Sequence, residues 1–473
     1  MMECKLKISG VVPLREEFRF AEPVDWTILD GERWTIVGPN GAGKSILTDL
    51  ITGRVLYRHG TVELAGGSVY QDIKKVEFRD IYSLIDCANI YYQKRWNAFD
   101  LDEEPFAEEI LAGYPTKRVN ELLGLFGMEP PAGKRLISLS SGELRKLLIV
   151  RTLLSKPKLL ILDNPFIGLD AGSRQALSDM LGRMSAIGGL QTVLVMSDPK
   201  EIPGWVDRLL PVRDMALLPS VTLAEFKADK ALQNKLFIRN ALAGGLPVGD
   251  AAQTSCEVVI GVRNVSVGYG SQPILSGVDW EVRRGEKWAL LGANGSGKST
   301  LLSLVNGDNP QAYANDVTLF DRRRGTGEGI WEIKRRIGYL NADLHSYYLQ
   351  DIPAVEVVVS GFFDSIGLFR VADDDKYDKA RAWLEVFGAG HLAGRSFLKL
   401  SYGEQRLVML ARTFVKDPEV LILDEPMHGL DAGKKRLVGR VVEKFCAAPG
   451  KTLVYVTHYA EEIPPCVDKV KRL

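Results

Sequence analysis

The feature of this chain that most restricts its fold is an internal repeat that spans most of its length. Residues 31–47, "GERWTIVGPNGAGKSIL", return at 285–301 as "GEKWALLGANGSGKSTL", and residues 137–165 return at 398–426. In both copies, 23 residues separate the Ser of "LSSGE" or "LSYGE" from the Asp of "ILD". A repeat of this length with matched internal spacing indicates two related domains in one chain.

We expect a first domain over residues 1–215, a linker over 216–256 and a second domain over 257–473. In the linker, "FKADKALQNKLFIRNAL" predicts a short helix, and the Gly, Pro and Ala residues after it predict a flexible connection. Each copy alternates apolar runs such as "LLIL" and "TLVYV" with amphipathic stretches, which is typical of buried parallel strands joined by helices. The predicted fold class is therefore α/β, and 473 residues are enough for two large cores.

Composition limits the classes of partner and cellular location. The 60 Lys and Arg residues balance 60 Asp and Glu residues, so no bulk attraction to nucleic acid or to anionic lipid is expected. The five cysteines contain no CxxC pair, which argues against a zinc site or a disulfide framework. No apolar run approaches the ~18 residues of a membrane span. We expect a cytoplasmic protein, which could lie on a membrane through a partner.

Two glycine-rich segments match the phosphate-binding loop pattern, and each lies between an apolar strand and a helical pattern. Their Gly residues let backbone N–H groups close around phosphates, and Lys44 and Lys298 would reach the β and γ phosphates. We therefore expect nucleotide at both loops. The expected nucleotide-binding residues of the loops are Gly38, Pro39, Asn40, Gly41, Ala42, Gly43, Lys44, Ser45, Gly292, Ala293, Asn294, Gly295, Ser296, Gly297, Lys298, Ser299 and Thr300.

A metal ion is expected beside each loop. The hydroxyl group that follows the loop Lys holds Mg²⁺ in such sites, and an Asp at the end of a neighbouring strand binds it directly or through water. An isolated Asp at a strand end is commonly only a cap, but the phosphate loop that precedes it in the chain favours the metal interpretation. The expected Mg²⁺ ligands are Ser45, Asp163, Ser299 and Asp424.

A third motif narrows the class of nucleotide-binding protein. "LSSGE" and "LSYGE", together with "GLD" at 168–170 and 429–431, approximate the signature and the Asp loop of the ATP-binding cassette (ABC) ATPases. The chain resembles this family over nearly its whole length. The resemblance implies two tandem P-loop NTPase domains, each a RecA-like core with a parallel sheet and a helical subdomain. It also implies ATP as the nucleotide, bound with Mg²⁺.

In the family, two cassettes enclose two ATP molecules, and the signature of one cassette faces the phosphate loop of the other. Both cassettes lie in one chain here, so the resemblance implies an intramolecular sandwich and a monomer. A Ser and a Gly at the start of a helix also make an anion site on physical grounds, although they could serve only as a helix cap. The signature residues are Ser140, Ser141, Gly142 and Glu143, expected opposite Lys298, and Ser401, Tyr402, Gly403 and Glu404, expected opposite Lys44.

The two copies differ where the family has its hydrolytic residues. The resemblance assigns Glu425 to polarising the attacking water and His458 to the γ-phosphate, whereas the first copy has Asn164 after its strand Asp. We align "VLVMSDPKEIP" with "VYVTHYAEEIP" so that Asp198 corresponds to His458. An amide cannot accept a proton and an anion repels the γ-phosphate, so loss of base assistance costs ~10²–10⁴-fold in rate. We expect turnover mainly at the second copy, with Lys298 as its third catalytic residue; the alternative is an active site that tolerates Asn164.

Two further family features are altered or uncertain in position. The Gln that senses Mg²⁺ and couples to a membrane domain falls at Ala342 or Asn341 in the second copy and at Phe78 in the first. The aromatic side chain that stacks on adenine corresponds to Tyr269 in the second copy, with Phe18 as the candidate in the first. Coupling through the Gln position is therefore an open question.

Residues 285–340 and "SGFFDSIGLF" at 360–369 resemble the ModF/PhrA group, tandem ABC proteins named for molybdate transport and photorepair. That resemblance implies an architecture and no substrate. Three functions stay open: an ATPase that drives a partner such as a separately encoded integral-membrane subunit, a soluble translation factor, and a DNA-repair or chromosome-maintenance ATPase. The short linker lacks the long charged helix of the translation class, and the absence of zinc-type cysteines and of heptads disfavours the third. A ribosome or nucleic acid is thus the less favoured partner.

Overall fold

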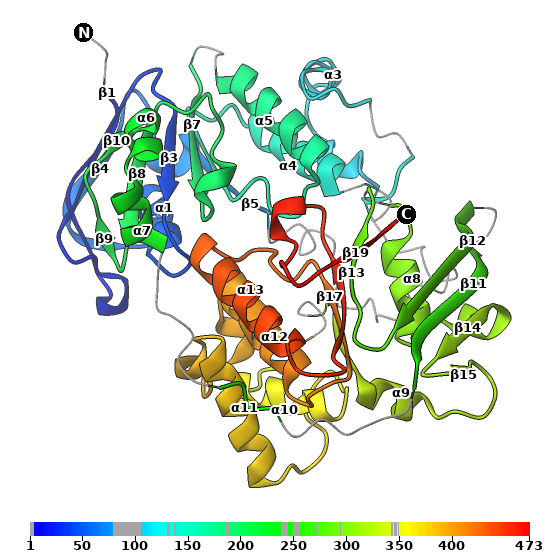
Figure 1. Ribbon diagram of the computed structural model, residues 1–473. Coiled ribbons are helices and arrows are strands. Elements are labelled where there is room, and N and C mark those ends of the chain that lie inside the picture. Colours follow the sequence, from blue (N-terminus) through cyan, green and yellow to red (C-terminus); the bar gives the residue numbers. More distant parts are fainter. Residues whose placement is uncertain are drawn as a thin grey trace. The chain divides into compact units, whose positions relative to one another are not determined.

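The structure is a computed structural model of the chain (Figure 1). It describes residues 4–78, 106–129, 133–136, 139, 141–185, 189–237, 245–248, 256–269, 272–293, 295–341, 344, 348 and 350–473. The chain forms two compact units, unit 1 with residues 1–239 and 430–433, and unit 2 with residues 240–429 and 434–473. Each unit contains a mainly parallel sheet, an antiparallel sheet and helices, which confirms the predicted α/β class.

Unit 1 alternates strands and helices after an antiparallel start. Its strands are β1 (Cys4–Pro13), β2 (Val24–Leu29), β3 (Trp34–Val37), β4 (Tyr57–Leu64), β5 (Ile73–Glu77), β6 (Leu159–Asp163), β7 (Gln191–Met196), β8 (Arg208–Arg213), β9 (Ala216–Leu217) and β10 (Val221–Thr222). Its helices are α1 (Lys44–Ile51), α2 (Val69–Asp72), α3 (Thr116–Leu125), α4 (Ser141–Leu154), α5 (Ala171–Ser185), α6 (Leu223–Ala228), α7 (Lys230–Phe237) and the 3₁₀ helices Glu16–Phe18, Glu109–Leu111 and Pro199–Glu201. One sheet has the order β2-β1-β4 and the other β10-β8-β3-β7-β6-β5, in which β3 and β5 to β8 are parallel.

Unit 2 repeats this plan with longer antiparallel strands. Its strands are β11 (Val258–Tyr269), β12 (Gln272–Arg283), β13 (Lys287–Leu291), β14 (Asp316–Leu319), β15 (Arg322–Arg323), β16 (Ile337–Leu340), β17 (Val420–Asp424), β18 (Thr452–Val456) and β19 (Lys469–Arg472). Helices that begin in this half of the sequence are α8 (Lys298–Val305), α9 (Ile330–Arg336), α10 (Ala354–Val359), α11 (Asp374–Val386), α12 (Tyr402–Phe414), α13 (Ala432–Cys446) and the 3₁₀ helices Pro310–Ala314, Ser360–Phe362, Gly390–Leu392, Phe397–Lys399 and Ala460–Glu462. The sheets have the orders β12-β11-β14-β15 and β16-β17-β18-β13-β19, and the second is parallel throughout.

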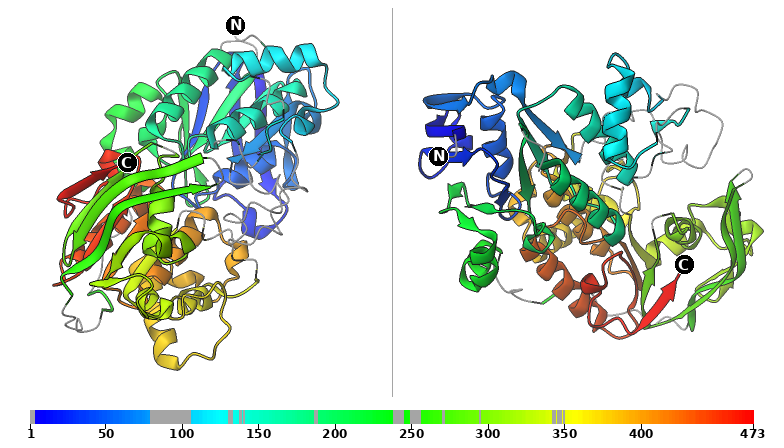
Figure 2. Two further views of the ribbon diagram at one scale, coloured as in Figure 1. Left: turned by 90° about the vertical axis from the view of Figure 1, so that its right-hand side faces the viewer. Right: turned by 90° about the horizontal axis from the view of Figure 1, so that it is seen from above.

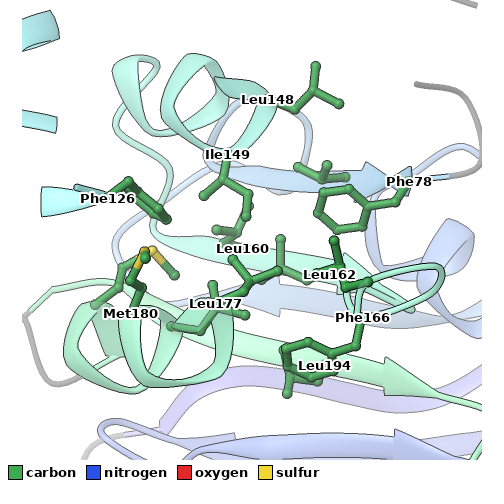
Figure 3. Packing of buried hydrophobic residues seen from close by; sticks show 14 of the residues in the cluster. Phe78, Phe126, Leu148, Ile149, Leu160, Leu162, Phe166, Leu177, Met180 and Leu194 are labelled. Atoms are coloured by element: carbon green, nitrogen blue, oxygen red, sulfur yellow. The ribbon is translucent and has the colours of Figure 1, made fainter. Parts of the chain in front are cut away.

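The central strands β3, β6, β7, β17 and β18 of the parallel sheets are buried on both faces, which explains why they read as continuous apolar runs. In β6, Leu160 and Leu162 lie among side chains from α4 and α5, such as Ile149 and Leu177, and all four are at most 2% exposed (Figure 3). Burying one such side chain contributes about 1.5–3 kcal/mol. The carboxyl end of β6, at Asp163, is thereby fixed by a packed core.

The opposite face of each parallel sheet packs on the helix that follows the phosphate loop. In unit 2, one apolar cluster joins the antiparallel sheet, α8 and the strands β13, β17 and β18. The long strands β11 and β12 are seen edge to edge in Figure 2, and α8 contacts β12 and β14. Unit 1 has the matching cluster around α1. The start of each of these helices is therefore held between two sheets.

The expected helical subdomain is present in both units. In unit 2, α10, α11 and α12 pack on one another, and Trp383 of α11 is fully buried with its ring 5.1 Å from that of Phe414 in α12. In unit 1, α3 packs on α4. Among the described helices, none is both long enough and apolar enough to cross a membrane.

The structure differs from the predicted linker at residues 216–256. Strands β9 and β10 and helices α6 and α7 follow residue 215 and belong to unit 1, where Phe226, Leu236 and Phe237 are buried in the core. Two helices form instead of one because Asp229 ends α6 and its carboxylate then accepts a hydrogen bond from the Leu232 N–H at 2.8 Å. The boundary between the units falls after residue 239.

Candidate functional site

In each unit the glycine-rich loop joins a buried parallel strand to a helix, β3 to α1 and β13 to α8. The glycine just before each helix has a left-handed backbone, with φ of 106° at Gly43 and 90° at Gly297. A Cβ atom would lie 2.7 Å from Met215 Sδ at the first position and 2.5 Å from Leu275 Cδ2 at the second. Both positions therefore require glycine, and the phosphate-loop shape that the sequence predicts forms in both units.

The loop lysines point back into their own loops. Lys44 Nζ donates to the first two carbonyl groups of its loop at 2.7 and 2.8 Å, and Lys298 Nζ makes the same two bonds at 2.8 Å each. Both side chains are at least nine-tenths buried, and Ser45 is half-buried while Ser299 is exposed. Each loop thus holds an ammonium group beside a hydroxyl group at a helix N-terminus. The expected loop residue Asn294 lies outside the described residues.

Two residues that directly follow parallel strands share an unusual backbone. Asn164 follows β6 and Glu425 follows β17, and each has φ of 49° and an N–H that donates to the neighbouring strand, at 2.8 and 3.0 Å. Asn adopts this left-handed conformation far more readily than a longer side chain does. Glu425 is therefore held in a conformation that its side chain does not favour, and strain of this kind concentrates at functional sites.

In unit 2 the two expected hydrolytic side chains lie together. His458 Nε2 is 3.3 Å from Glu425 Oε1, and both side chains are largely buried. Burial first, and then the nearby carboxylates with Asp424 foremost, together raise the pKa of Glu425 to about 8, while Lys298 opposes the change. A carboxyl group whose proton affinity is raised above its ordinary value is a stronger base once it is ionised, and such groups beside an imidazole serve in acid–base chemistry.

In unit 1 the side chain equivalent to Glu425, that of Asn164, already makes a hydrogen bond to its neighbour in the chain. Asn164 Nδ2 donates to Asp163 Oδ1 at 2.8 Å, so the amide is directed to the strand Asp. This side chain carries no group that can take up a proton.

The strand register corrects one of the predicted correspondences. The Asp that ends each strand pairs with Val195 in unit 1 and with Val456 in unit 2. Two residues further along stand Ser197 and His458, so Ser197 takes the place that we assigned to Asp198. The two eleven-residue strings, compared end to end without a gap, also place Ser197 opposite His458, so the assignment of Asp198 was wrong by one position. Asp198 instead caps the following 3₁₀ helix by accepting from the Lys200 N–H at 3.0 Å.

Ser197 was missed because a serine after a strand carries no motif of its own. It is 7% exposed, and its hydroxyl group has no hydrogen-bond partner within the described part of the chain. A buried hydroxyl group without a partner is costly and commonly marks a functional position.

The signature helix of unit 2 begins with a capping box. The N–H and Oγ of Ser401 both donate to Glu404 Oε2, at 2.8 and 2.7 Å. The hydroxyl group of Tyr402 lies 2.7 Å from His428 Nδ1, and Gly403 is buried. The first turn of α12 is therefore tied to the loop that follows β17.

In unit 1 the signature helix α4 begins at Ser141, and Ser140 lies outside the described residues. Gly142 is half-buried in the first turn of α4. Glu143 forms an ion pair with Lys134 at 3.5 Å, with both side chains partly exposed.

The two candidate adenine-stacking residues differ in how far the structure describes them. Tyr269 ends β11, paired with Gln272, and its side chain is outside the described part of the chain. Phe18 is half-buried in a 3₁₀ helix, with the Arg15 guanidinium 5.8 Å from its ring. Phe20, which sequence reasoning missed, is buried beside the phosphate loop, within 3.2 Å of where a Gly43 Cβ would stand.

The positions aligned with the family's Gln differ between the units. Phe78 is buried, and Arg145 places its guanidinium 5.4 Å from the ring. The carbonyl group of Asn341 accepts from Arg406 Nη1 at 3.2 Å, while Ala342 lies outside the described residues.

Arg406 is a supporting residue that the motifs do not reveal. It is 1% exposed, and its Nη2 donates to the carbonyl group of Asp424 at 2.8 Å and to that of Glu425. In unit 1, Arg145 holds the same region through the carbonyl group of Pro165 at 2.6 Å. A buried guanidinium thus fixes the chain just after each strand Asp.

The expected Mg²⁺ ligands are a hydroxyl group and a carboxylate in each unit. The hydroxyl group of Ser299 and the carboxylate of Asp424 are hard oxygen donors of the kind that Mg²⁺ takes. In unit 1, one carboxylate oxygen of Asp163 accepts a hydrogen bond from the Asn164 amide.

The sequence profile of the ABC transporter family matches residues 21–167 and 275–428. The chain belongs to this family. It is 36% identical to the ABC transporter ATP-binding protein ModF of Escherichia coli (strain K12), over 93% of this chain and 91% of that protein. An ABC transporter ATP-binding protein of Schizosaccharomyces pombe, described as uncharacterized, is 25% identical over 98% of this chain and 96% of its own length. The resemblance to tandem ABC proteins of the ModF group is confirmed.

Solved structures of ABC proteins share the fold. The model of ribosome-bound archaeal Pelota and ABCE1 contains a chain with a TM-score of 0.58 and 20% identity, covering 94% of this ABC protein and 72% of that chain. The archaeal ribosome recycling factor aABCE1, in complex with ribosomal stalk protein aP1, gives a TM-score of 0.53 at 18% identity, covering 94% and 83%. Two tandem ABC-type domains are thereby shown, and the family implies ATP binding and hydrolysis.

Proposed function

We propose that this ABC protein is an ATPase with two unequal sites, in which hydrolysis occurs mainly at the site built on Lys298, Asp424, Glu425 and His458. One observation carries the proposal: Glu425 lies 3.3 Å from His458, whereas its counterpart Asn164 is bonded to the neighbouring Asp. Loss of a general base costs about 10²–10⁴-fold in rate, so the Asn164 site retains ATP and turns over slowly.

At the faster site, Lys298 and the loop N–H groups bind the phosphates; Ser299 and Asp424 would hold Mg²⁺, which would supply positive charge to offset that of the phosphates. Glu425 accepts the proton of the water that attacks the γ-phosphorus atom. His458 donates a hydrogen bond to a γ-phosphate oxygen as negative charge develops there.

We propose further that each site is completed by the signature helix of the other cassette. Ser140 and Gly142 would close on the ATP at Lys298, and Ser401 and Gly403 on the ATP at Lys44. Tethering within one chain gives an effective concentration near ~1 mM, so a monomer suffices for closure. Support comes from the start of α12, where Gly403 stands at a helix N-terminus of the kind that binds anions.

We propose that closure drives a partner protein, with a separately encoded integral-membrane subunit as the first candidate and peripheral membrane association as the consequence. The ModF relative is named as an ABC transporter protein, which supports this candidate. The second candidate is a soluble, non-transport role for this protein. We retain it because two of the chains that share the fold come from ribosome-linked structures. Affinity purification of Glu425→Gln with ATP, which holds the closed state, tests both. A permease in the eluate supports the first candidate, and a ribosome or DNA supports the second.

Steady-state ATPase assays of two variants test the asymmetry. Glu425→Gln should remove nearly all activity, whereas Asn164→Ala should change it by less than about twofold, because it removes no base. Equal losses in the two variants would refute unequal sites. Nucleotide stoichiometry gives the complementary measurement: two ATP per chain in the wild type and one after either Lys44→Ala or Lys298→Ala.

A further inference from the structure

A glutamate on the turn after His458 contacts two neighbours and has no part in the mechanism proposed above. Glu462 ends the 3₁₀ helix Ala460–Glu462. Its Oε1 is 3.0 Å from Lys435 Nζ, near the start of α13, and its Oε2 accepts a hydrogen bond from Thr457 Oγ1 at 3.3 Å. Both side chains of the ion pair are largely buried. The carboxylate thus connects α13 to the residue that directly precedes His458.

Thr457 extends this connection to the backbone on both sides of His458. It is fully buried, and its Oγ1 also accepts a hydrogen bond from the Tyr459 N–H at 3.1 Å. A hydroxyl group has one hydrogen to donate, and here it is directed to Glu462. The oxygen lone pairs then remain for the Tyr459 N–H. Glu462 therefore sets the orientation of the group that fixes the turn around His458.

The ion pair itself occurs in both units. In unit 1, Glu201 ends the 3₁₀ helix after β7 and lies 3.6 Å from Arg174, near the start of α5. Glu201 follows Ser197 by four residues, as Glu462 follows His458. An ion pair that joins a helix to the neighbouring turn in both units is explained by the fold that they share.

The hydroxyl contact distinguishes the two units. Met196 directly precedes Ser197 in unit 1, at the place where Thr457 precedes His458 in unit 2. A thioether has no hydrogen to donate to a carboxylate. The group that links the glutamate to the turn is therefore present in the unit with the histidine and replaced by an apolar side chain in the other. A role in the shared fold alone would not require the hydroxyl group to accompany the histidine.

Glu462 also acts on the Glu425 site through its charge. Its carboxylate is one of the groups that raise the pKa of Glu425. The buried hydroxyl group of Tyr455, on β18, has a pKa well above its usual range, because of burial first and then the charges of Glu462 and Glu425. Both carboxylates therefore lie close enough to the end of β18 to influence the same groups.

We infer that Glu462 and Thr457 are positioning residues of the faster site: the carboxylate orients the Thr457 hydroxyl group, which holds the turn that directs His458 to Glu425. This inference deepens the proposed function and rests on it, since it requires that His458 take part in hydrolysis. Both residues act through His458 and not on the nucleotide, so their loss should change kcat and leave KM nearly constant. A misplacement of about 1 Å at a reacting group can cost ~10²-fold in rate.

Steady-state ATPase kinetics of the full chain test the inference. Valine has nearly the shape of threonine without the hydroxyl group, so Thr457→Val should lower kcat by about tenfold or more and change KM by less than about twofold. Thr457→Ser keeps the hydroxyl group and should stay within about threefold of the wild-type kcat. Glu462→Ala should lower kcat as Thr457→Val does, whereas its matched control in unit 1, Glu201→Ala, should leave kcat within about twofold of the wild type.

A double-variant cycle shows whether Thr457 acts through His458. In the His458→Ala background, Thr457→Val should lower kcat by less than about twofold, because the side chain that it positions is absent. An equal drop in both backgrounds, or a wild-type kcat for Thr457→Val alone, would overturn the inference. Glu462→Ala in the same two backgrounds decides the question if Thr457→Val does not fold. If His458→Ala itself kept the wild-type kcat, the proposed function would fail, and the inference with it.

Discussion

His458 Nε2 lies 3.3 Å from Glu425 Oε1, whereas the residue at the position of His458 in unit 1, Ser197, has a buried hydroxyl group. In the mechanism that we propose, the imidazole orients the carboxylate and donates a hydrogen bond to the γ-phosphate. His458→Ala should lower kcat by about 10–10³-fold with a small change in KM. Ser197→Ala is the matched control and should leave kcat within about twofold of the wild type, since it alters the site that we propose turns over slowly. Similar losses in steady-state kcat for both variants would contradict the assignment.

The left-handed backbone at Glu425 predicts a conflict between stability and activity. Glu425→Asn should raise the free energy of unfolding of the nucleotide-free protein by about 1 kcal/mol, because Asn accepts φ of 49° and the buried carboxyl group at position 425 is removed. The same variant should lose ATPase activity. Chemical denaturation measures the first effect, and Asn164→Glu should show the opposite shift.

Glu425→Gln separates the two reasons for the expected stability of Glu425→Asn, which are the left-handed backbone and the removal of the buried carboxyl group. It removes the buried carboxyl group but keeps a long side chain at the left-handed position. If backbone conformation contributes, Glu425→Asn will be the more stable of the two. Equal stabilities would show that the backbone is not strained by the longer side chain.

Much of the architecture could be predicted because the repeat is visible in short motifs. The paired Trp residues illustrate how closely the copies correspond: Trp26 and Trp34 have ring centroids 5.3 Å apart, Trp280 and Trp288 5.9 Å, and both pairs are edge to face. In each pair the second Trp donates its Nε1 to a carboxylate two residues earlier at 2.8 Å. Local sequence fixes such contacts, so the strand and loop predictions hold.

The features that sequence reasoning missed depend on partners far apart in the chain. Lys75 looks like a surface residue of a short strand until Asp49 and Asp163 are brought around it. Residues 216–239 read as a linker because the apolar face of α7 shows its use only when it packs on unit 1. The assignment of Asp198 is a different kind of error, because the ungapped strings "VLVMSDPKEIP" and "VYVTHYAEEIP" already place Ser197 opposite His458. Strand pairing gives the same correspondence independently.

Among the residues outside the sequence motifs, Arg406 should be the one whose replacement lowers the stability of unit 2 most. Its guanidinium is 1% exposed and donates to two successive carbonyl groups, those of Asp424 and Glu425. Arg406→Met should lower the free energy of unfolding by about 3 kcal/mol, because buried acceptors lose their donor. Arg406→Lys keeps the positive charge but lacks the planar guanidinium that donates to two carbonyl groups. It should therefore retain only part of the wild-type stability and ATPase rate. Wild-type denaturation midpoints for both variants would contradict this role.

A buried ion pair in unit 2 predicts a pH dependence of stability. Burial lowers the pKa of Lys416 to about 8, although Asp364, whose two carboxylate oxygens are each 2.6 Å from Lys416 Nζ, opposes the change. The ordinary value is 10.5, so between pH 8 and 10.5 the unfolded chain binds more protons at this residue than the folded chain does. The contribution of Lys416 to stability therefore rises with pH across this window and is constant and unfavourable below it.

The Lys416→Met variant lacks this titration and isolates it from other groups that change at high pH. From pH 8 to 10 the free energy of unfolding of the wild type should rise relative to that of the variant by on the order of 2 kcal/mol. The measurement is denaturant unfolding of both proteins at matched pH values. Asp364→Asn removes the partner that holds the proton on Lys416, so the pKa falls further and the rise should begin at lower pH. Parallel curves for the wild type and Lys416→Met would mean that Lys416 keeps its ordinary pKa in the folded protein, and that its buried ammonium group is fully compensated by Asp364.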